Sequence, residues 1–150
     1  MTEQSNEKKL VHTMTIPVRW GDMDALGHVN NTVYFRYMEQ ARIEWLAAMG
    51  CLPDENGNGP VIVSARCDFR KPLTYPDQVE VCTYIYSLGK SSFETAQEMR
   101  SVNDGYAVYA EGGATVVWVD SKTGKGTPFP DAIRTKYAEL KGDQQGRRVR

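Results

Sequence analysis

The residues best suited to chemistry gather in one short segment near the N-terminus. Residues 19–31 read R-W-G-D-M-D-A-L-G-H-V-N-N, which brings together two carboxylates, an imidazole and two side-chain amides. An apolar-periodic stretch begins directly afterwards at about Thr32, so we expect Asn30 or Asn31 to cap a helix there. The first backbone N–H groups of a helix have no partner inside it, and they can hold an anion or an oxyanion. The sequence therefore predicts a reactive site where the loop meets the helix.

This segment resembles the hotdog-fold thioesterases, specifically the 4-hydroxybenzoyl-CoA thioesterase-like family of acyl-CoA hydrolases. The pattern that carries the likeness is D-x-D-x-x-G-H-V-N-N-x-x-Y at the start of one long helix. Its residues are Asp22, Asp24, Gly27, His28, Val29, Asn30, Asn31 and Tyr34, with Glu39 further along. A bare D-x-D would be a weak signal, since paired aspartates also occur in metal loops and solvated turns. The likeness extends more loosely over residues 12–140.

The resemblance implies catalytic roles for three residues of the segment. Asp24 aligns with the family's catalytic carboxylate, and the backbone N–H near Asn31 with its oxyanion donor. Asp22 is interpreted as a residue that braces the loop, although the residues alone also fit an Asx turn or a helix cap for either aspartate. An ordinary aspartate is a poor base at neutral pH, with a pKa of about 3.9. Two routes therefore stay open: general-base activation of water, and direct attack on the thioester.

His28 is the third catalytic candidate. Plant-type acyl-carrier-protein thioesterases, which look like relatives, carry an asparagine in this loop where the chain has Leu26. This departure leaves His28 as a positioning or hydrogen-bonding residue, or as a structural residue beside the helix start. His12 lies in a strand pattern with no partner motif and is given no function. Glu39 is a second-rank carboxylate candidate, whose spacing from Tyr34 and Arg42 also suits a buried hydrogen bond or an i,i+3 ion pair.

Further residues are expected to bind the substrate. The resemblance implies contacts from Gly27, which permits close approach of the loop, and from Asn30 and Tyr34. Coenzyme A brings phosphates, so cations should line its path. The candidates are Arg66, Arg70, Lys71 and Lys90, of which Arg70 and Lys90 are the chosen pair. A solvated surface cation is the alternative explanation for each of them.

The order of elements determines the fold class. Helical spacing of apolar residues runs from Thr32 to Met49, and strand patterns cover about 12–20, 61–70, 78–88, 92–102 and 106–120. Strands and helices do not alternate, which excludes a parallel doubly wound sheet. We expect an α+β hotdog fold, in which a five-stranded antiparallel sheet wraps around the long helix. Gly112–Gly113 indicates a bulge, and residues 130–140 a short closing helix.

The helix can cover only one face of this sheet. Two of the strand patterns carry apolar or aromatic residues on both faces, so the other face is expected to meet a second subunit. The resemblance implies the same, as a homodimer or a dimer-of-dimers tetramer.

No cofactor is expected. No metal is expected either, because Asp22 and Asp24 lack further ligands at useful spacing.

Length and composition narrow the function classes. The chain has 150 residues, which fits one domain, and we expect that domain at 11–141 with flexible ends at 1–10 and 142–150. Its net charge of −1 gives no indication of a surface for nucleic acid or membrane. Neither a signal-peptide core nor a membrane span is visible. Three widely spaced cysteines indicate reduced, buried thiols in a cytoplasm rather than nucleophiles or a disulfide framework.

The sequence-based hypothesis is an acyl-CoA thioesterase, acting on a thioester of coenzyme A or of acyl carrier protein. Two alternatives remain. Hotdog hydratases or dehydratases pair a catalytic histidine with a carboxylate in a differently spaced motif, which is not found here. A non-catalytic acyl-CoA-binding module would be expected to lose the loop carboxylate, and this chain keeps Asp24.

Overall fold

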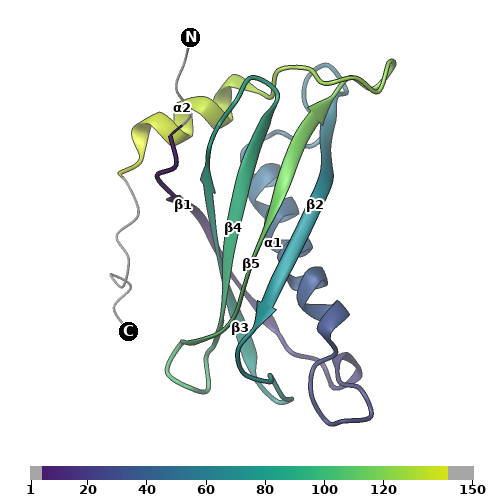
Figure 1. The fold of residues 1–150 in the computed structure, drawn as a ribbon, viewed down its shortest axis with the longest axis vertical. Coiled ribbons are helices and arrows are strands. Elements are labelled where there is room, and N and C mark those ends of the chain that lie inside the picture. Colours follow the sequence, from purple (N-terminus) through teal and green to yellow (C-terminus); the bar gives the residue numbers. More distant parts are fainter. Residues whose placement is uncertain (1–4, 142–150) are drawn as a thin grey trace.

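A computed structural model describes residues 5–141 and contains one antiparallel sheet with a long helix against it (Figure 1). In chain order the elements are β1 (Lys9–Pro17), a 3-10 helix (Trp20–Asp22), α1 (Asn31–Ala48), β2 (Gly59–Phe69), β3 (Gln78–Tyr86), β4 (Ser92–Ser101), β5 (Ala107–Val119) and α2 (Asp131–Glu139). The strand order is β1-β3-β4-β5-β2, and every neighbouring pair is antiparallel. The hotdog fold that the sequence predicts is confirmed.

Helix α1 forms where the apolar periodicity predicts it. The side chain of Asn30 accepts a hydrogen bond from the Thr32 N–H, so Asn30 is the N-cap and Asn31 the first helical residue. The apolar face of the helix packs onto the sheet, and its large side chains include two of the bulkiest residues of the core, Met38 and Trp45. This packing fixes the start of α1 relative to the ends of the strands.

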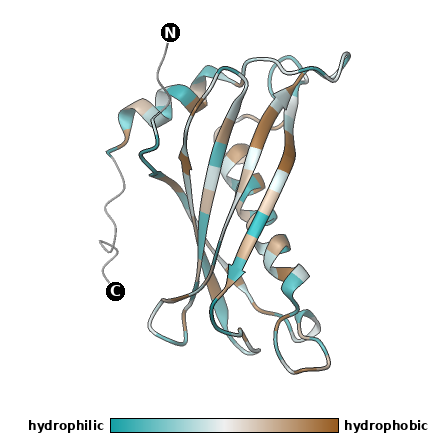
Figure 2. Ribbon diagram, in the orientation of Figure 1, coloured by the Kyte–Doolittle hydropathy of each residue, from teal (hydrophilic) through white to brown (hydrophobic). Residues whose placement is uncertain are grey.

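The central strand β4 alternates strictly between the helix-facing side and the open side of the sheet. Phe93, Thr95, Gln97 and Met99 are buried under α1, whereas the intervening side chains are half-buried. These intervening residues include Glu94, Glu98 and Arg100, so β4 presents charges on the open face. Figure 2 shows hydrophobic residues side by side in the first part of β2 and the last part of β5, which are paired with each other.

The predicted bulge at Gly112–Gly113 is wrong. The register of β5 runs without interruption through both glycines, and the irregularities lie between Ile62 and Ser64 and between Met99 and Arg100. The glycines are needed for space instead. A Cβ on Gly112 would lie 2.6 Å from the Arg66 carbonyl oxygen and 2.7 Å from the Met38 sulfur. Gly112 therefore allows α1 to approach the sheet closely.

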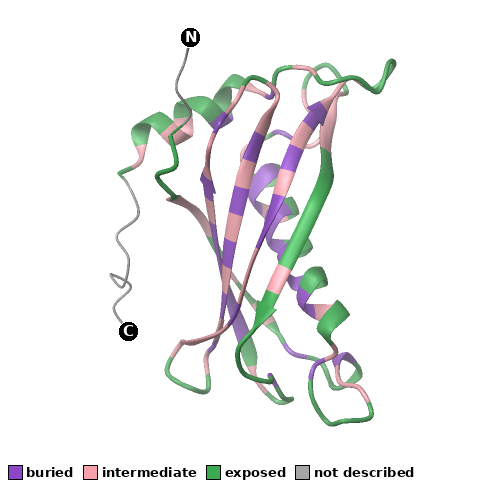
Figure 3. Ribbon diagram, viewed as in Figure 1, coloured by how far each residue is buried: buried purple, intermediate pink, exposed green. Residues whose placement is uncertain are grey.

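Strand β2 forms one edge of the sheet and is mostly exposed (Figure 3). Val61, Ile62, Val63 and Phe69 are exposed large apolar residues of this strand, and Val63 is 59% exposed. An edge strand presents unpaired N–H and C=O groups that can pair with another chain. The largest apolar exposure of the sheet thus lies at this edge.

The chain ends differ in part from the predicted flexible segments. Residues 5–8 contact the body of the domain, because the Ser87 N–H donates to the Ser5 carbonyl and the Tyr137 hydroxyl to the Glu7 carbonyl. Strand β1 begins at Lys9, earlier than predicted. Residues 1–4 and 142–150 lie outside the described residues. Neither described helix has the length and apolar character needed to cross a membrane.

Candidate active site

Asp22 holds the loop against helix α1. It is buried, and its Oδ2 atom accepts hydrogen bonds from the Tyr37 hydroxyl at 2.8 Å and from the Arg19 N–H at 3.0 Å. Burial, together with the Asp22 carboxylate, raises the pKa of Tyr37, so the tyrosine remains a proton donor. The carboxylate of Asp22 is therefore occupied with positioning, which agrees with the bracing role predicted from the sequence.

Asp24 lies two residues further on, in a tight turn. Its Oδ1 accepts a hydrogen bond from the Leu26 N–H at 2.9 Å, and its Oδ2 accepts one from the Asn30 amide at 3.1 Å. The backbone closes the turn through Gly27, whose N–H donates to the Asp24 carbonyl and whose φ of +81° favours glycine. Each carboxylate oxygen accepts one bond here and keeps capacity for another donor, such as a water molecule.

The start of α1 lies beside this carboxylate. The Oδ1 atom of Asn30 accepts from the Thr32 N–H at 2.9 Å, while the amide nitrogen of the same side chain donates to Asp24. The N–H of Asn31 has no hydrogen-bond acceptor among residues 5–141. The helix thus contributes one free backbone donor next to a positioned carboxylate.

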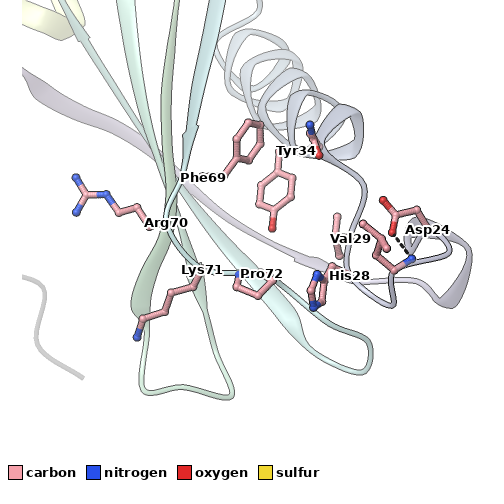
Figure 4. Close-up of a pocket in the computed structure, with 10 residues that line it drawn as sticks. Asp24, His28, Val29, Tyr34, Phe69, Arg70, Lys71 and Pro72 are labelled. Carbon is pink, nitrogen blue, oxygen red and sulfur yellow. Dashed lines mark hydrogen bonds between the residues drawn. The ribbon is translucent and has the colours of Figure 1, made fainter.

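These groups meet in a pocket of about 350 Å³ between the loop, α1 and the end of β2 (Figure 4). The lining residues are Asp24, Leu26, His28, Val29, Asn31, Tyr34, Phe69, Arg70, Lys71 and Pro72. Five of the predicted site residues are therefore brought together: Asp24, His28, Asn31, Tyr34 and Arg70. Gly27 and Asn30 shape the turn and the cap behind this lining.

Tyr34 forms part of the pocket wall. Its hydroxyl accepts a hydrogen bond from the Leu73 N–H at 3.1 Å, and its ring meets that of Phe69 edge to face, with centroids 4.9 Å apart. Burial raises the pKa of Tyr34, so the hydroxyl keeps its proton. That proton has no acceptor within residues 5–141. In Figure 4 the hydroxyl lies between Val29 and Pro72, where it can donate to a ligand.

The two pocket cations are already paired. Arg70 contacts Glu111 at 2.6 Å, and Lys71 lies 3.7 Å from Asp104. Both pairs are solvent-exposed, so they are weak and can be exchanged for a ligand phosphate.

Lys90 is not at this pocket. Lys90 precedes the first residue of β4, whereas the last residue of β4 pairs with the start of β5, beside the pocket. The ten residues of β4 span roughly 30 Å, which is the distance between Lys90 and the pocket. A lysine side chain of the same chain cannot bridge that length.

Other predicted side chains take structural partners. Glu39 forms an exposed i,i+3 pair with Arg36 at 3.1 Å, and not the pair with Arg42 that its spacing suggested. His12 contacts Glu44 of α1 at 2.7 Å and so connects β1 to the helix.

Phe69 and Pro72, which form walls of the pocket, were not predicted from the sequence. Only the F-R-K-P run after a strand pattern could have indicated them.

Comparisons with known proteins agree with the fold. Residues 18–137 match the profile of the thioesterase-like superfamily. Among solved structures, the PA2801 protein from Pseudomonas aeruginosa, a "putative thioesterase", is 41% identical, with a TM-score of 0.81. That alignment covers 86% of this chain and 99% of the other.

Two sequence relatives extend the likeness. A "putative esterase" of Aquifex aeolicus is 35% identical over 79 residues, which is 51% of this chain and only 62% of the relative. The long-chain acyl-CoA thioesterase FadM of Escherichia coli is 25% identical over 134 residues, covering 83% of this chain and 96% of FadM. The fold and these likenesses together define a hotdog enzyme of the thioester hydrolase class. This chain belongs to the thioesterase-like superfamily.

Proposed function

We propose that this protein hydrolyses acyl-CoA thioesters in the pocket at the start of α1. The observation that carries the proposal is the convergence of Asp24 and the free Asn31 N–H on one pocket. A fixed backbone donor stabilises the negative charge that develops on a thioester carbonyl, and a carboxylate supplies the base or the nucleophile. The likeness to a long-chain acyl-CoA thioesterase supports an acyl-CoA as the substrate.

Two chemical routes fit the arrangement. In the first, Asp24 removes a proton from a water molecule, whose oxygen attacks the thioester carbon. In the second, a carboxylate oxygen of Asp24 attacks that carbon, expels the thiolate and forms a mixed anhydride that water then cleaves. In both routes the tetrahedral oxyanion is bound by the Asn31 N–H. Both release a carboxylic acid and a thiol.

The remaining lining residues have positioning roles in this proposal. The free proton of the Tyr34 hydroxyl can be donated to the substrate, and the apolar edge of Phe69 faces the acyl group. His28 is exposed at the mouth of the pocket, where it can hydrogen-bond the thioester arm. Arg70 is the cation nearest to a coenzyme phosphate. Lys90 contributes only if it comes from a second copy of the chain.

The second copy is part of the proposal. The exposed apolar residues of β2 and the unpaired edge of that strand support pairing of two β2 strands across a two-fold axis. Such pairing would cover the open side of the pocket next to Phe69. Dimers could then associate further into a tetramer. The free thiols of Cys51 and Cys82, both buried, fit a reducing compartment such as the cytoplasm.

A thiol-release assay across short-chain, long-chain and aromatic acyl-CoAs tests this function, with acyl carrier protein thioesters in parallel. We expect turnover of at least one class and loss of that turnover in Asp24→Asn. Binding of acyl-CoA without thiol release would contradict hydrolysis and support a non-catalytic binding module. Hydration of an enoyl-CoA without thiol release would instead support hydratase chemistry.

A further inference from the structure

A second pocket lies further along α1, outside the predicted site. Its volume is about 200 Å³, room for roughly seven groups of the size of water. Ile43, Leu46, Ile62, Phe93 and Val116 give it mainly apolar walls between α1 and the sheet. Its polar lining consists of two buried hydrogen-bond donors, from Arg42 and Trp45, together with the buried Thr95 hydroxyl and the exposed Glu39 carboxylate.

Arg42 is a buried cation that interacts with the Glu39 carboxylate, three residues earlier in α1, only from beyond ion-pair distance. It is 8% exposed and has no carboxylate within ion-pair distance among residues 5–141. Its one hydrogen bond, to the Gln97 Oε1 atom, is long at 3.4 Å. The amide nitrogen of Gln97 is turned away toward Met38 and Thr83. A guanidinium has five donors and binds carboxylates in a bidentate manner, so Arg42 retains most of its capacity.

Trp45 adds a second unused donor. Its ring packs edge to face on Phe93, but its indole Nε1 is fully buried and has no hydrogen-bond partner in the described part of the chain. A buried N–H without a partner costs free energy, and buried indoles usually find one. Two other polar groups of the lining are already engaged, since the Thr95 hydroxyl donates to the Ala114 carbonyl and the Glu39 carboxylate pairs with Arg36. Within residues 5–141 the pocket therefore combines apolar walls with two donors and lacks an acceptor matched to them. A ligand with a terminal oxygen acceptor would supply it.

The position of Arg42 relates this pocket to the thioester site. Asn31 and Arg42 are eleven residues apart in α1, or about three turns, so they share one side of the helix at roughly 16 Å separation. Phe35 and Glu39 lie between them and are exposed in the single chain. An extended chain of single bonds advances about 1.2 Å per bond, so about 12 to 13 bonds span this distance.

We propose that the Arg42 pocket receives the far end of the acyl chain and selects chains of about twelve carbons that end in a carboxylate. This inference rests on the proposed thioesterase function and specifies its substrate class. The carboxylate pairs with the Arg42 guanidinium and accepts the Trp45 N–H, while the methylene groups follow the apolar walls. A plain alkyl chain of the same length would leave both donors unpaired.

The test compares matched substrates: dodecanoyl-CoA, the mono-CoA thioester of dodecanedioic acid, and the mono-CoA thioester of hexanedioic acid. We expect the wild-type protein to have a kcat/KM for the twelve-carbon diacid at least about tenfold above that for dodecanoyl-CoA. The six-carbon diacid carries the same carboxylate but is too short to reach Arg42. It should show no dependence on that residue.

Variants separate specificity from folding. Arg42→Met should abolish the preference by lowering kcat/KM for the long diacid alone, and Arg42→Lys should restore part of it. Trp45→Phe keeps the ring and removes only the unpaired N–H, so it should weaken the preference without lowering the melting temperature. Arg134→Met, on α2 and outside the lining of both pockets, is the matched control. Arg134→Met should leave all three rates unchanged.

Two results would overturn the inference. One is a wild-type protein that hydrolyses the plain and the carboxylated chain equally well. The other is an Arg42→Met variant that lowers both rates by the same factor, which would make Arg42 a structural or subunit-contact residue. Either result leaves thioester hydrolysis standing. If no acyl-CoA is hydrolysed, the proposed function fails. Calorimetry with free dodecanedioate then still tests whether the pocket binds a carboxylate through Arg42, since wild type should bind it and Arg42→Met should not.

Discussion

Asn30 connects the catalytic loop to the helix through one side chain. Its amide nitrogen lies 3.1 Å from the Asp24 Oδ2 atom, while its Oδ1 accepts the Thr32 N–H at 2.9 Å. The group that caps α1 is thus the group that orients the carboxylate. The stability of the helix start and the placement of Asp24 are therefore coupled. Substitutions of Asp24 and of Asn30 can distinguish the effect on stability from the effect on catalysis.

Asp24→Asn should lower turnover by about two to four orders of magnitude, because it removes the general base or nucleophile. The amide oxygen of asparagine can still accept the Leu26 N–H, so the melting temperature should change little. Thiol release and thermal unfolding measured on the same preparation check both statements. An unchanged rate would remove Asp24 from the mechanism. In the wild type, single-turnover hydrolysis in heavy-oxygen water distinguishes the routes, since label entering Asp24 indicates direct attack.

Asn30→Ser and Asn30→Ala should differ in stability but not in catalysis. Serine is a good N-cap and alanine is not, so only the alanine variant should lose about 0.5–2 kcal/mol in the free energy of unfolding. Neither side chain can donate an amide hydrogen bond to Asp24, so both variants should lower kcat. Urea unfolding and steady-state kinetics provide the two readouts. Wild-type kcat in Asn30→Ser would show that the amide contact to Asp24 is not needed.

Val63→Lys should weaken self-association through β2. Val63 is 59% exposed on the edge strand, and a lysine there places like charges opposite each other across a two-fold axis. Sedimentation of wild type and variant over a range of concentrations measures the effect. Arg134→Ala, on the exposed side of α2, serves as a surface control for association. A wild-type protein that stays monomeric at micromolar concentration would refute the β2 interface.

The buried thiol of Cys82 should make the protein less stable in alkali. Burial, followed by the nearby Glu80 and Glu98 carboxylates, raises the pKa of Cys82 from 9.0 to about 12. Between these values the unfolded chain loses the thiol proton while the folded chain keeps it, so the free energy of unfolding falls as pH rises. Below about pH 9 the contribution is constant. Urea unfolding from pH 8 to 10 should show a smaller decline in Cys82→Ala, and an equal decline would contradict this assignment.

Gly112→Ala should destabilise the fold by about 1–3 kcal/mol through overpacking. The added methyl group would lie 2.6 Å from a backbone oxygen of β2 and 2.7 Å from the Met38 sulfur, so the helix or the strand must move. Gly21→Ala is the matched control, because a Cβ there meets nothing within 4 Å. Denaturant midpoints of the two variants give the comparison. Equal midpoints would mean that both the Met38 side chain and the Arg66 carbonyl move aside at no cost.

Short-range features of this protein follow from the sequence alone. The cap at Asn30, the turn of Asp24 and Gly27, and the extent of α1 involve hydrogen bonds between residues two to six apart, so the local pattern specifies them. The strands follow from their period of two and the turn residues between them. The five-stranded antiparallel hotdog fold then follows from the order of elements.

Only the tertiary structure decided which distant residues meet. The register of β2 against β5 brings Phe69 and Arg70 to the loop pocket, pairs Arg70 with Glu111, and makes Gly112 a packing site rather than a bulge. The direction of β4 carries Lys90 to the opposite end of the sheet. These outcomes depend on strand order, register and helix packing, which are set by the summed burial of many side chains. No single motif encodes them.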